Sequence, residues 1–264
     1  MKPAFSVVMP TFNSARTIDA ALASVLSQTF KDLEVVVVDG VSTDDTAERV
    51  ARRARSDPRV RWFSEKDRGI YDAMNRGMKL ARGDWLYFIG SDDRLAGDDV
   101  LKRVAAQASQ HRVLYGNVGI VGDSPWAADG SLYDGRFSLR KLLVKNICHQ
   151  AMFYRRDFIE ERIGAYSIEF PVCADWDFNL RCWAQTPFHF LDLTIAIFHT
   201  GGQSTENVYD AGFTEGFIER SLGYFGMSPM HPVYLTAFPN RRRELLGHWW
   251  RSLKAKTGRP AAWR

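Results

Sequence analysis

The chain of 264 residues is 45% hydrophobic and 25% charged and carries a formal net charge of +4. This balance is that of an ordinary globular protein and excludes a disordered or fibrous chain. The sequence has no run of about 18 apolar residues that could span a membrane, and no secretory leader is evident after Met1, so we expect a cytoplasmic protein.

The first ninety residues predict strands that alternate with helices. The expected strands are short apolar runs over 5–9, 33–38, 60–63 and 85–89. A helical pattern separates each from the next; in the helix expected over 71–81, for example, Met74 and Met78 share one face. Strands that are apolar throughout and joined by helices are typical of a parallel sheet covered on both faces. The expected fold is therefore α/β, with a Rossmann-like, mostly parallel sheet.

The pattern is less regular in the second half of the chain. A helix is expected over 101–108, and Gly, Asp, Ser and Pro predict an irregular loop over 116–135. The later expected elements are a strand over 151–155, a helix over 175–185 and a strand over 190–198. An odd number of cysteines without a C-x-x-C pair favours reduced core residues over disulfides or a zinc site. These cysteines are Cys148, Cys173 and Cys182.

Polar side chains fall at the carboxyl ends of the first four expected strands. They are Thr11, Asp39, Asp67 and the pair Asp92 and Asp93. In an open parallel sheet, ligands bind beyond these strand ends. One such residue alone would more often cap a helix or turn, but four in succession predict a site for a ribose, a base edge and a cation. Two adjacent carboxylates after an apolar strand suit Mg²⁺ or Mn²⁺ bound together with a diphosphate.

Longer motifs join these positions. They are Val8–Asn13, Val38–Gly40, Ser64–Gly77, Ala81–Asp84 and Ser91–Asp93. This linked set resembles the inverting glycosyltransferase family 2, of the GT-A fold, and within it the colanic-acid and exopolysaccharide type. The resemblance extends to about Ser204. It implies transfer of a sugar, with inversion, from a nucleoside diphosphate to a glycan or lipid-linked acceptor in cell-surface polysaccharide synthesis.

The resemblance also implies roles for residues of the donor site. The implied nucleotide-sugar contacts are Thr11, Asn13, Asp39, Asp67, Gly69, Asn75 and Asp92. Of these, Asn75 suits a role in bracing its helix equally well. Asp93 stands where the metal-binding motif of the family ends, which implies an Mn²⁺ or Mg²⁺ ligand. His199 ends a strand before two glycines, and it is a candidate for the last metal ligand or a diphosphate contact.

The second half is expected to supply the acceptor site. The segment Ala174–Arg181 resembles the Glu-Asp segment of the family, with Ala174 in place of the usual Glu. On that alignment Asp175 is the general base, which would accept the proton of the attacking hydroxyl. Asp177 is the alternative base, and a helix-capping role is open for either residue. The implied acceptor contacts are His149, Gln150 and Trp176.

These motifs predict a GT-A domain over 1–205 and a helical, basic C-terminal region over 206–264. Within the domain, 1–97 would bind the nucleotide sugar and 98–205 the acceptor. Two other classes of protein are alternatives. A sugar-phosphate nucleotidyltransferase would carry a Gly-rich, basic loop after the first strand, which Pro10–Ala15 lacks. A non-catalytic nucleotide-sugar-binding protein would not need the full acidic set.

The C-terminal tail is the most basic part of the chain. Residues 241–264 hold eight Lys or Arg and one Glu, a local charge of +7, which leaves −3 for the rest. An apolar stripe at helical spacing accompanies this charge: Leu245, Leu246, Trp249, Trp250 and Leu253. The pattern is typical of a helix at the inner face of a membrane, but a helix docked on its own domain explains it equally well. Nucleic acid is not expected, because no binding module accompanies the charge.

Overall fold

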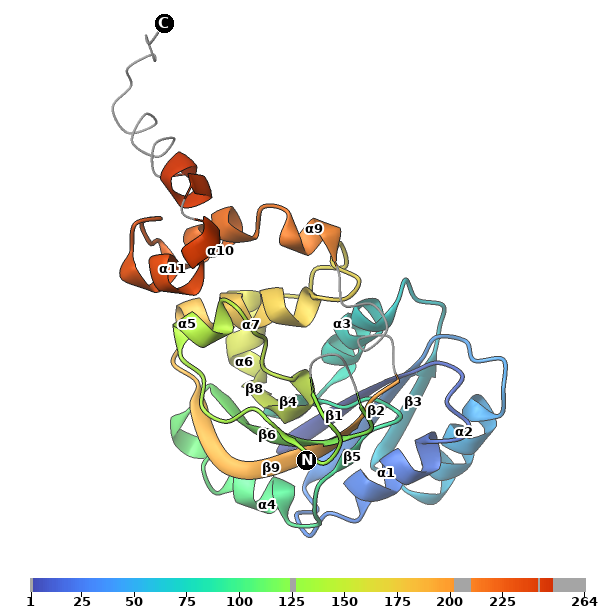
Figure 1. The fold of residues 1–264 in the computed structure, drawn as a ribbon. Coiled ribbons are helices and arrows are strands. Elements are labelled where there is room, and N and C mark those ends of the chain that lie inside the picture. The colour runs from blue at the N-terminus through green and yellow to red at the C-terminus, as the bar shows by residue number, and fades with distance from the viewer. Residues whose placement is uncertain (1, 124–126, 202–209, 242, 249–264) are drawn as a thin grey trace, which may run out of the picture.

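The computed structural model describes residues 2–123, 127–201, 210–241 and 243–248 (Figure 1). A mixed sheet with the strand order β3-β2-β1-β4-β8-β6-β9-β5 runs through its centre. The strands are β1 (Phe5–Thr11), β2 (Leu33–Asp39), β3 (Val60–Ser64), β4 (Trp85–Phe88), β5 (Arg94–Leu95), β6 (Val113–Val121), β7 (Leu132–Tyr133), β8 (Met152–Arg155) and β9 (His189–His199). β7 pairs with β6, off this main order.

The first four strands are parallel to one another, as predicted. Every residue of β1 and β2 is buried, which agrees with a sheet covered on both faces. Because successive side chains of a strand point to opposite faces, Val7 contributes to one core cluster and Val8 to another. The parallel arrangement brings the carboxyl ends of these strands to one edge of the sheet.

Helices cover both faces of the sheet (Figure 1). On one face lie α1 (Ile18–Leu26), α2 (Thr46–Ser56) and α4 (Val100–Ala105); on the other lie α3 (Ile70–Leu80), α5 (Leu139–Leu142), α6 (Arg156–Phe158) and α7 (Ala174–Gln185). Short 3₁₀ segments occur at Ala108–Gln110, His149–Ala151 and Pro239–Arg241, and a π-helical turn at Ile159–Ile163. The expected helix over 101–108 is thus divided into α4 and a separate 3₁₀ turn.

The prediction of an irregular loop over 116–135 is wrong for its first part, because β6 continues to Val121. Gly116 is a site of close backbone approach rather than a turn: a Cβ there would lie 2.4 Å from the backbone oxygen of Leu193 in β9. The register between β6 and β9 shifts at this point. A glycine in a strand can mark such an approach or bulge, and here the local composition concealed a strand.

The second half of the sheet is mixed in direction. β8 runs antiparallel to β4 and β6, whereas β9 runs parallel to β6 and antiparallel to β5. β5 follows the acidic pair directly, so its pairing with β9 brings the end of β9 to the edge where β4 ends. This long-range pairing is what carries His199 to the predicted site.

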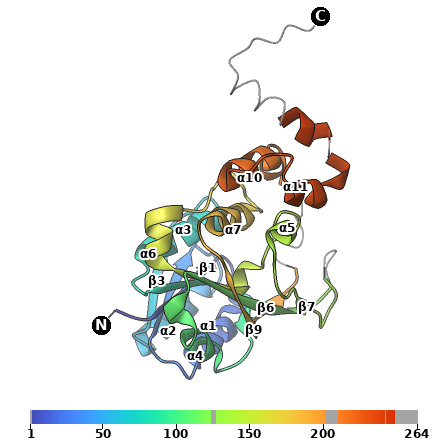
Figure 2. The ribbon, with the colours of Figure 1, turned by 90° about the vertical axis from the view of Figure 1, so that its left-hand side faces the viewer.

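The C-terminal region is helical over the part that the structure describes. It comprises α9 (Ala211–Thr214), α10 (Phe217–Phe225), α11 (Pro232–Ala237) and a helix over 243–248. α10 packs on α7 and α11 packs on α5, on the side away from the sheet (Figures 1 and 2). Leu245 is fully buried while Leu246 is 47% exposed. Trp249, Trp250 and Leu253 of the predicted stripe lie outside the described residues.

Within the described ranges, no helix combines the length and the apolar character needed to cross a bilayer. The three cysteines are free thiols, as predicted. Only Cys182 lies wholly in the core, because Cys148 and Cys173 are partly exposed and face a cavity.

Candidate functional site

Three adjoining cavities lie at the carboxyl edge of the parallel strands. The strand-end cavity, of about 600 Å³, is lined by residues that include Thr11, Phe12, Asn13, Arg16, Asp67, Gly69 and Asp92. The central cavity, of about 120 Å³, shares Ile70, Gly90 and Asp92 with it and is further lined by Asp93, His199 and Asp175. The apolar cavity, of about 330 Å³, shares His149, Gln150 and Asp175 with the central one. The predicted donor and acceptor residues therefore meet at the central cavity.

Asp93 is buried at the wall of the central cavity and is held by the second half of the chain. Its Oδ2 accepts a hydrogen bond from Gln150 Nε2 at 2.7 Å, and its Oδ1 accepts one from the backbone N–H of His199 at 3.0 Å. Burial, followed by the negative charge of Asp92, raises the pKa of Asp93 to about 7. Asp92 is exposed. A cation between the two carboxylates would offset both of these unfavourable effects.

The residues around Asp93 fit a divalent cation. His199 Nδ1 is buried, has no hydrogen-bond partner and lines the same cavity as Asp92 and Asp93. In the described part of the chain, no group of three or more His, Cys, Asp or Glu is placed to hold a metal by itself. Mg²⁺ is typically held by only one or two carboxylates, with water and phosphate oxygens completing its shell. A site of one or two carboxylates and an imidazole is thus sufficient in the presence of a diphosphate.

The loop after β1 is tied to the loop after β2. Asn13 adopts a φ of 49°, and its Oδ1 accepts a hydrogen bond from the backbone N–H of Thr43 at 2.9 Å. The backbone N–H of Asn13 donates to Ser42 Oγ at 2.8 Å. Asp39 is fully buried, and its carboxylate accepts hydrogen bonds from Ser42 and from Ser64. Asn13 and Asp39 therefore shape the strand-end cavity, but only Asn13 lines it.

Three other predicted donor residues lie directly on the strand-end cavity. Thr11 is buried and its hydroxyl has no partner, which leaves a hydrogen-bonding group for a ligand. Asp67 Oδ1 accepts the backbone N–H of Gly69 at 2.9 Å. Gly69 has a φ of 119°, a value that side chains disfavour, so a glycine is required where the chain turns into α3. Thr11, Asp67 and Gly69 thus line one cavity, and their contact with a nucleotide stays a prediction.

Asn75 lies away from the described cavities. Its Nδ2 donates to the carbonyl oxygen of Tyr166 at 2.9 Å, and its Oδ1 accepts the Tyr166 N–H at 2.8 Å. Both amide groups are used in this pair, and the side chain is buried. The structure favours the bracing role, in which Asn75 anchors the segment before α7 to α3.

Asp175 lies in the first turn of α7, where the central cavity joins the apolar cavity. Its Oδ1 is 3.1 Å from the hydroxyl of Tyr71 and accepts its neighbour's backbone N–H at 2.8 Å; its Oδ2 is 3.5 Å from His149 Nδ1. Burial keeps the pKa of Tyr71 well above its ordinary value, so this hydroxyl stays protonated. Its single proton is shared between the carbonyl oxygen of Val172, at 2.7 Å, and the more distant Asp175 Oδ1. His149 Nε2 is buried without a partner. The Asp175 carboxylate and the His149 imidazole form one polar group at the junction of two cavities.

Asp177 points in another direction. It is buried, accepts a hydrogen bond from Tyr224 of α10 at 2.7 Å and pairs with Arg181 at 2.8 Å. It lines neither the central nor the apolar cavity. Between the two candidate bases the geometry favours Asp175, while Asp177 attaches the C-terminal helices to α7.

A family model described as glycosyl transferase family 2 matches residues 6–163, more than half of the chain. The chain belongs to glycosyl transferase family 2. The match includes the acidic pair and Gln150, and it ends before α7. Membership confirms the predicted enzyme class, a glycosyltransferase, over the nucleotidyltransferase and the non-catalytic binder.

This family 2 glycosyltransferase is similar to curated bacterial relatives. A PGL/p-HBAD biosynthesis glycosyltransferase of Mycobacterium bovis is 39% identical over 215 residues, which cover 80% of this chain and 82% of the relative. A chondroitin synthase of Escherichia coli is 39% identical over 194 residues, which cover 72% of this chain and 28% of that protein. The first alignment spans most of both chains, so the likeness extends beyond the family model.

Solved structures of glycosyltransferases share the fold. S. aureus TarS 1–349, in complex with UDP-GlcNAc, has a TM-score of 0.68 at 20% identity, covering 95% of this chain and 80% of that one. A mannosyltransferase of Pyrobaculum calidifontis, in complex with GDP-Man and Mn²⁺, has a TM-score of 0.64 at 16% identity, covering 99% and 77%. At these identities the likeness concerns the fold alone, and it confirms the predicted GT-A architecture.

Two site residues of the glycosyltransferase escaped prediction from sequence. In the sequence pattern Tyr71 is an ordinary apolar residue of the helix α3. Only the tertiary structure places its hydroxyl 3.1 Å from Asp175 Oδ1. Phe12 carried a weak signal, since it is an aromatic residue between two predicted donor contacts. It is 60% exposed and lines the strand-end cavity. An exposed aromatic ring on the predicted nucleotide cavity is suited to stacking on a base.

We expect Phe12→Ala to weaken nucleotide binding about tenfold, because stacking of a base on an aromatic ring contributes about 1–3 kcal/mol. Folding stability should change by less than about 0.5 kcal/mol, since the side chain is largely exposed. Titration calorimetry with UDP or GDP measures the first effect and thermal unfolding the second. An unchanged dissociation constant would show that Phe12 does not contact the base.

Proposed function

We propose that this enzyme transfers a sugar from a nucleoside diphosphate to a hydroxyl of a glycan or lipid-linked acceptor, with inversion at the anomeric carbon. One observation carries the proposal. The central cavity has Asp92 on the side it shares with the strand-end cavity, Asp93 in its own wall and Asp175 on the side it shares with the apolar cavity. Donor and acceptor can therefore meet between a leaving-group site and a base.

On the acceptor side, Asp175 accepts the proton of the attacking hydroxyl. One carboxylate suffices for an inverting displacement, because the oxygen attacks directly from the face opposite the diphosphate. The backbone N–H of Trp176 holds Oδ1, with the Tyr71 hydroxyl 3.1 Å away, which leaves Oδ2, beside His149, to meet the acceptor. His149 and Gln150 line the wall along which the acceptor enters.

On the donor side, Thr11, Asn13, Asp67 and Gly69 bind the nucleotide and Asp92 the sugar or ribose. Asp93 and His199 would hold Mn²⁺ or Mg²⁺ together with the diphosphate oxygens. The cation would supply Lewis-acid stabilisation of the departing diphosphate. Gln150 and the His199 backbone orient Asp93 for this role.

The kind of acceptor is proposed from the relatives and from the charge of the tail. The Mycobacterium bovis relative is named for PGL/p-HBAD biosynthesis and the Escherichia coli relative for chondroitin synthesis. Both names fit a glycan or glycolipid acceptor in cell-surface biosynthesis. A lipid-linked acceptor would bring the enzyme to the inner face of the membrane, which the basic residues 241–264, mostly outside the described part, are suited to meet.

Thermal unfolding with UDP, GDP and dTDP, each with and without Mn²⁺, tests the donor assignment. The correct nucleotide should raise the unfolding temperature, and Mn²⁺ should increase the effect. Because Asp93 must lose a proton before it binds a cation, Mn²⁺ affinity should fall about tenfold for each pH unit below 7. Stabilisation by none of the nucleotides would contradict the proposal, and Mn²⁺ binding that persists unchanged in Asp93→Asn would remove Asp93 from the metal site.

A further inference from the structure

The apolar cavity is unusual for a site that would hold a sugar. Its walls are formed largely by Tyr133, Val144, Val172, Trp176 and Phe198. With about 330 Å³ it exceeds the roughly 150 Å³ that accommodates a benzene-sized molecule. A hexose presents hydroxyl groups in most directions, and each needs a hydrogen-bond partner when it leaves water.

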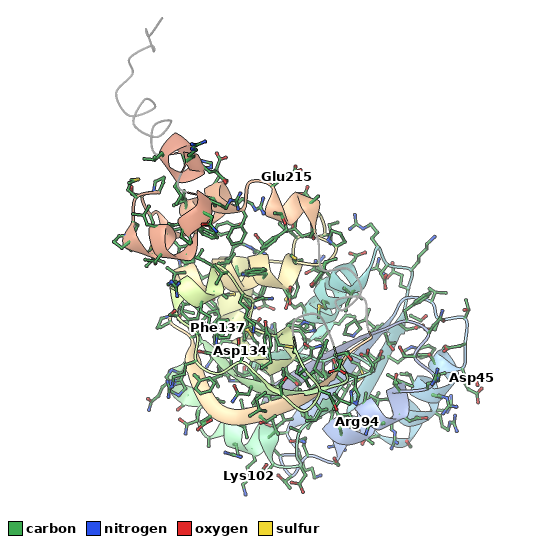
Figure 3. The ribbon with its side chains drawn as sticks, in the orientation of Figure 1. Asp45, Arg94, Lys102, Asp134, Phe137 and Glu215 are labelled. Carbon is green, nitrogen blue, oxygen red and sulfur yellow. The ribbon has the colours of Figure 1, made fainter. Side chains whose placement is uncertain are left out.

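The polar groups along these walls are largely engaged with the protein. Trp176 Nε1 donates to the carbonyl oxygen of Leu142 at 2.7 Å, and the Tyr133 hydroxyl donates to the carbonyl oxygen of Asn146 at 2.8 Å. Lys145 Nζ pairs with Asp134 at 2.7 Å (Asp134 is labelled in Figure 3). These contacts turn the polar ends of the wall residues away from a bound molecule and leave ring faces and methyl groups toward it.

The two cysteines of the cavity add to its apolar character. The Cys148 thiol donates to Gln150 Oε1 at 2.8 Å, and that amide is also bonded to Asp93. Burial raises the pKa of Cys148 well above its ordinary value, and burial together with the Asp175 charge raises that of Cys173 to about 12. Both thiols are therefore uncharged at neutral pH and behave as small apolar groups.

One end of the apolar cavity is polar, in contrast to its walls. There the Asp175 carboxylate and His149, whose Nε2 has no partner, face the junction with the central cavity. A molecule that fills this space would place one polar atom at Asp175 and an apolar body against Trp176 and Val144. Continuity with the central cavity identifies that molecule as the acceptor, because the atom it places at Asp175 is the one that would be glycosylated.

We infer that the acceptor carries an aromatic ring beside its reacting hydroxyl. This inference rests on the proposed function, since it names the acceptor class of that same site. A hexose inside the apolar cavity itself is disfavoured, because each hydroxyl left there without a partner weakens binding about tenfold.

Binding of a matched pair of probes tests the inference without requiring turnover. Phenyl β-D-glucoside and methyl β-D-glucoside differ only in the apolar group. Saturation-transfer NMR with the full-length chain should show binding of the phenyl compound at least about tenfold tighter than the methyl compound. Equal affinities would overturn the inference.

Variants of Val144 locate the binding site. Val144 is 50% exposed and so lies at the mouth of the apolar cavity, where substitutions should leave the fold intact. Val144→Asp and Val144→Trp should each weaken phenyl glucoside binding at least about tenfold, the first by adding charge and the second by filling the space. Leu246→Asp is the matched control, since Leu246 is 47% exposed and lies outside this cavity. Unchanged binding in both Val144 variants would overturn the inference.

Release of nucleotide from the donor in the absence of acceptor distinguishes a failure of the proposed function from a failure of the inference about the acceptor. The Val144 variants should release nucleotide at the parent rate, because Val144 does not line the strand-end or central cavity. If the parent neither binds nor cleaves any nucleotide sugar, the proposed function fails and the inference fails with it. If the parent cleaves the donor but prefers the methyl glucoside, only the inference fails.

Discussion

Asp175→Asn is expected to lower kcat by about 10²- to 10⁴-fold, the usual contribution of a general base. Asparagine keeps an oxygen that can accept the backbone N–H of Trp176, and Tyr71 keeps its bond to the carbonyl oxygen of Val172, so the local structure should persist. Donor affinity should be unchanged, because Asp175 does not line the strand-end cavity. Steady-state kinetics of sugar transfer, together with nucleotide titrations, separate these two effects.

Asp177→Asn is the matched control for this experiment. Asp177 is buried against Arg181 and Tyr224, so its loss should lower the free energy of unfolding by about 3 kcal/mol. The kcat of the folded fraction should remain near that of the parent. Transfer at the parent rate by Asp175→Asn, with loss of transfer in Asp177→Asn, would reverse the assignment of the base.

Asp93→Asn is expected to remove the response to Mn²⁺ and to lower the rate of transfer by about 10³-fold. A metal ion stabilises developing negative charge by several kcal/mol, which corresponds to an effect of this size. The neutral amide is a poor ligand for a divalent cation but retains nearly the same volume at this buried position. The unfolding temperature with nucleotide should therefore no longer rise when Mn²⁺ is added.

Asp92→Asn serves as the comparison, because Asp92 is adjacent in sequence but exposed. As a donor contact it should affect mainly KM for the nucleotide sugar, and the stabilisation by Mn²⁺ should persist. The two single variants thus distinguish the metal ligand from its neighbour. An Mn²⁺ response that survives in Asp93→Asn and disappears in Asp92→Asn would exchange the two roles.

The donor half could be predicted closely because its signals are local. β1, β2, β3 and β4 follow from short apolar runs, and a polar residue at each strand end marks the edge where ligands bind. Thr11, Asp67 and Gly69 lie on the strand-end cavity for this reason. Asp39 has the same strand-end signal, and Asn75 was implied by the resemblance, but the structure uses both for internal hydrogen bonds. A polar residue at a strand end or on a helix does not reveal whether its partner is a ligand or the protein.

The acceptor half was harder to predict because its contacts are long-range. Gln150 and the His199 backbone reach Asp93 only through the pairing of β8 and β9 with the rest of the sheet. Gly116 suggested a loop but marks a close approach of β9 to β6. Such pairings join residues far apart in sequence, and no local periodicity records them.

The amino-acid sequence by itself determined the α/β fold, the strand-end edge and the family, since these depend on local periodicity and on contiguous motifs. Tertiary structure decided which carboxylate of α7 faces the site. Residues two apart on a helix point about 200° away from each other, so only one can face a given cavity. The packing of α10 on α7 turns Asp177 toward Tyr224 and leaves Asp175 for the site. Tertiary structure likewise decided the apolar character of the neighbouring cavity, because it directs the polar ends of Trp176 and Tyr133 to partners within the protein.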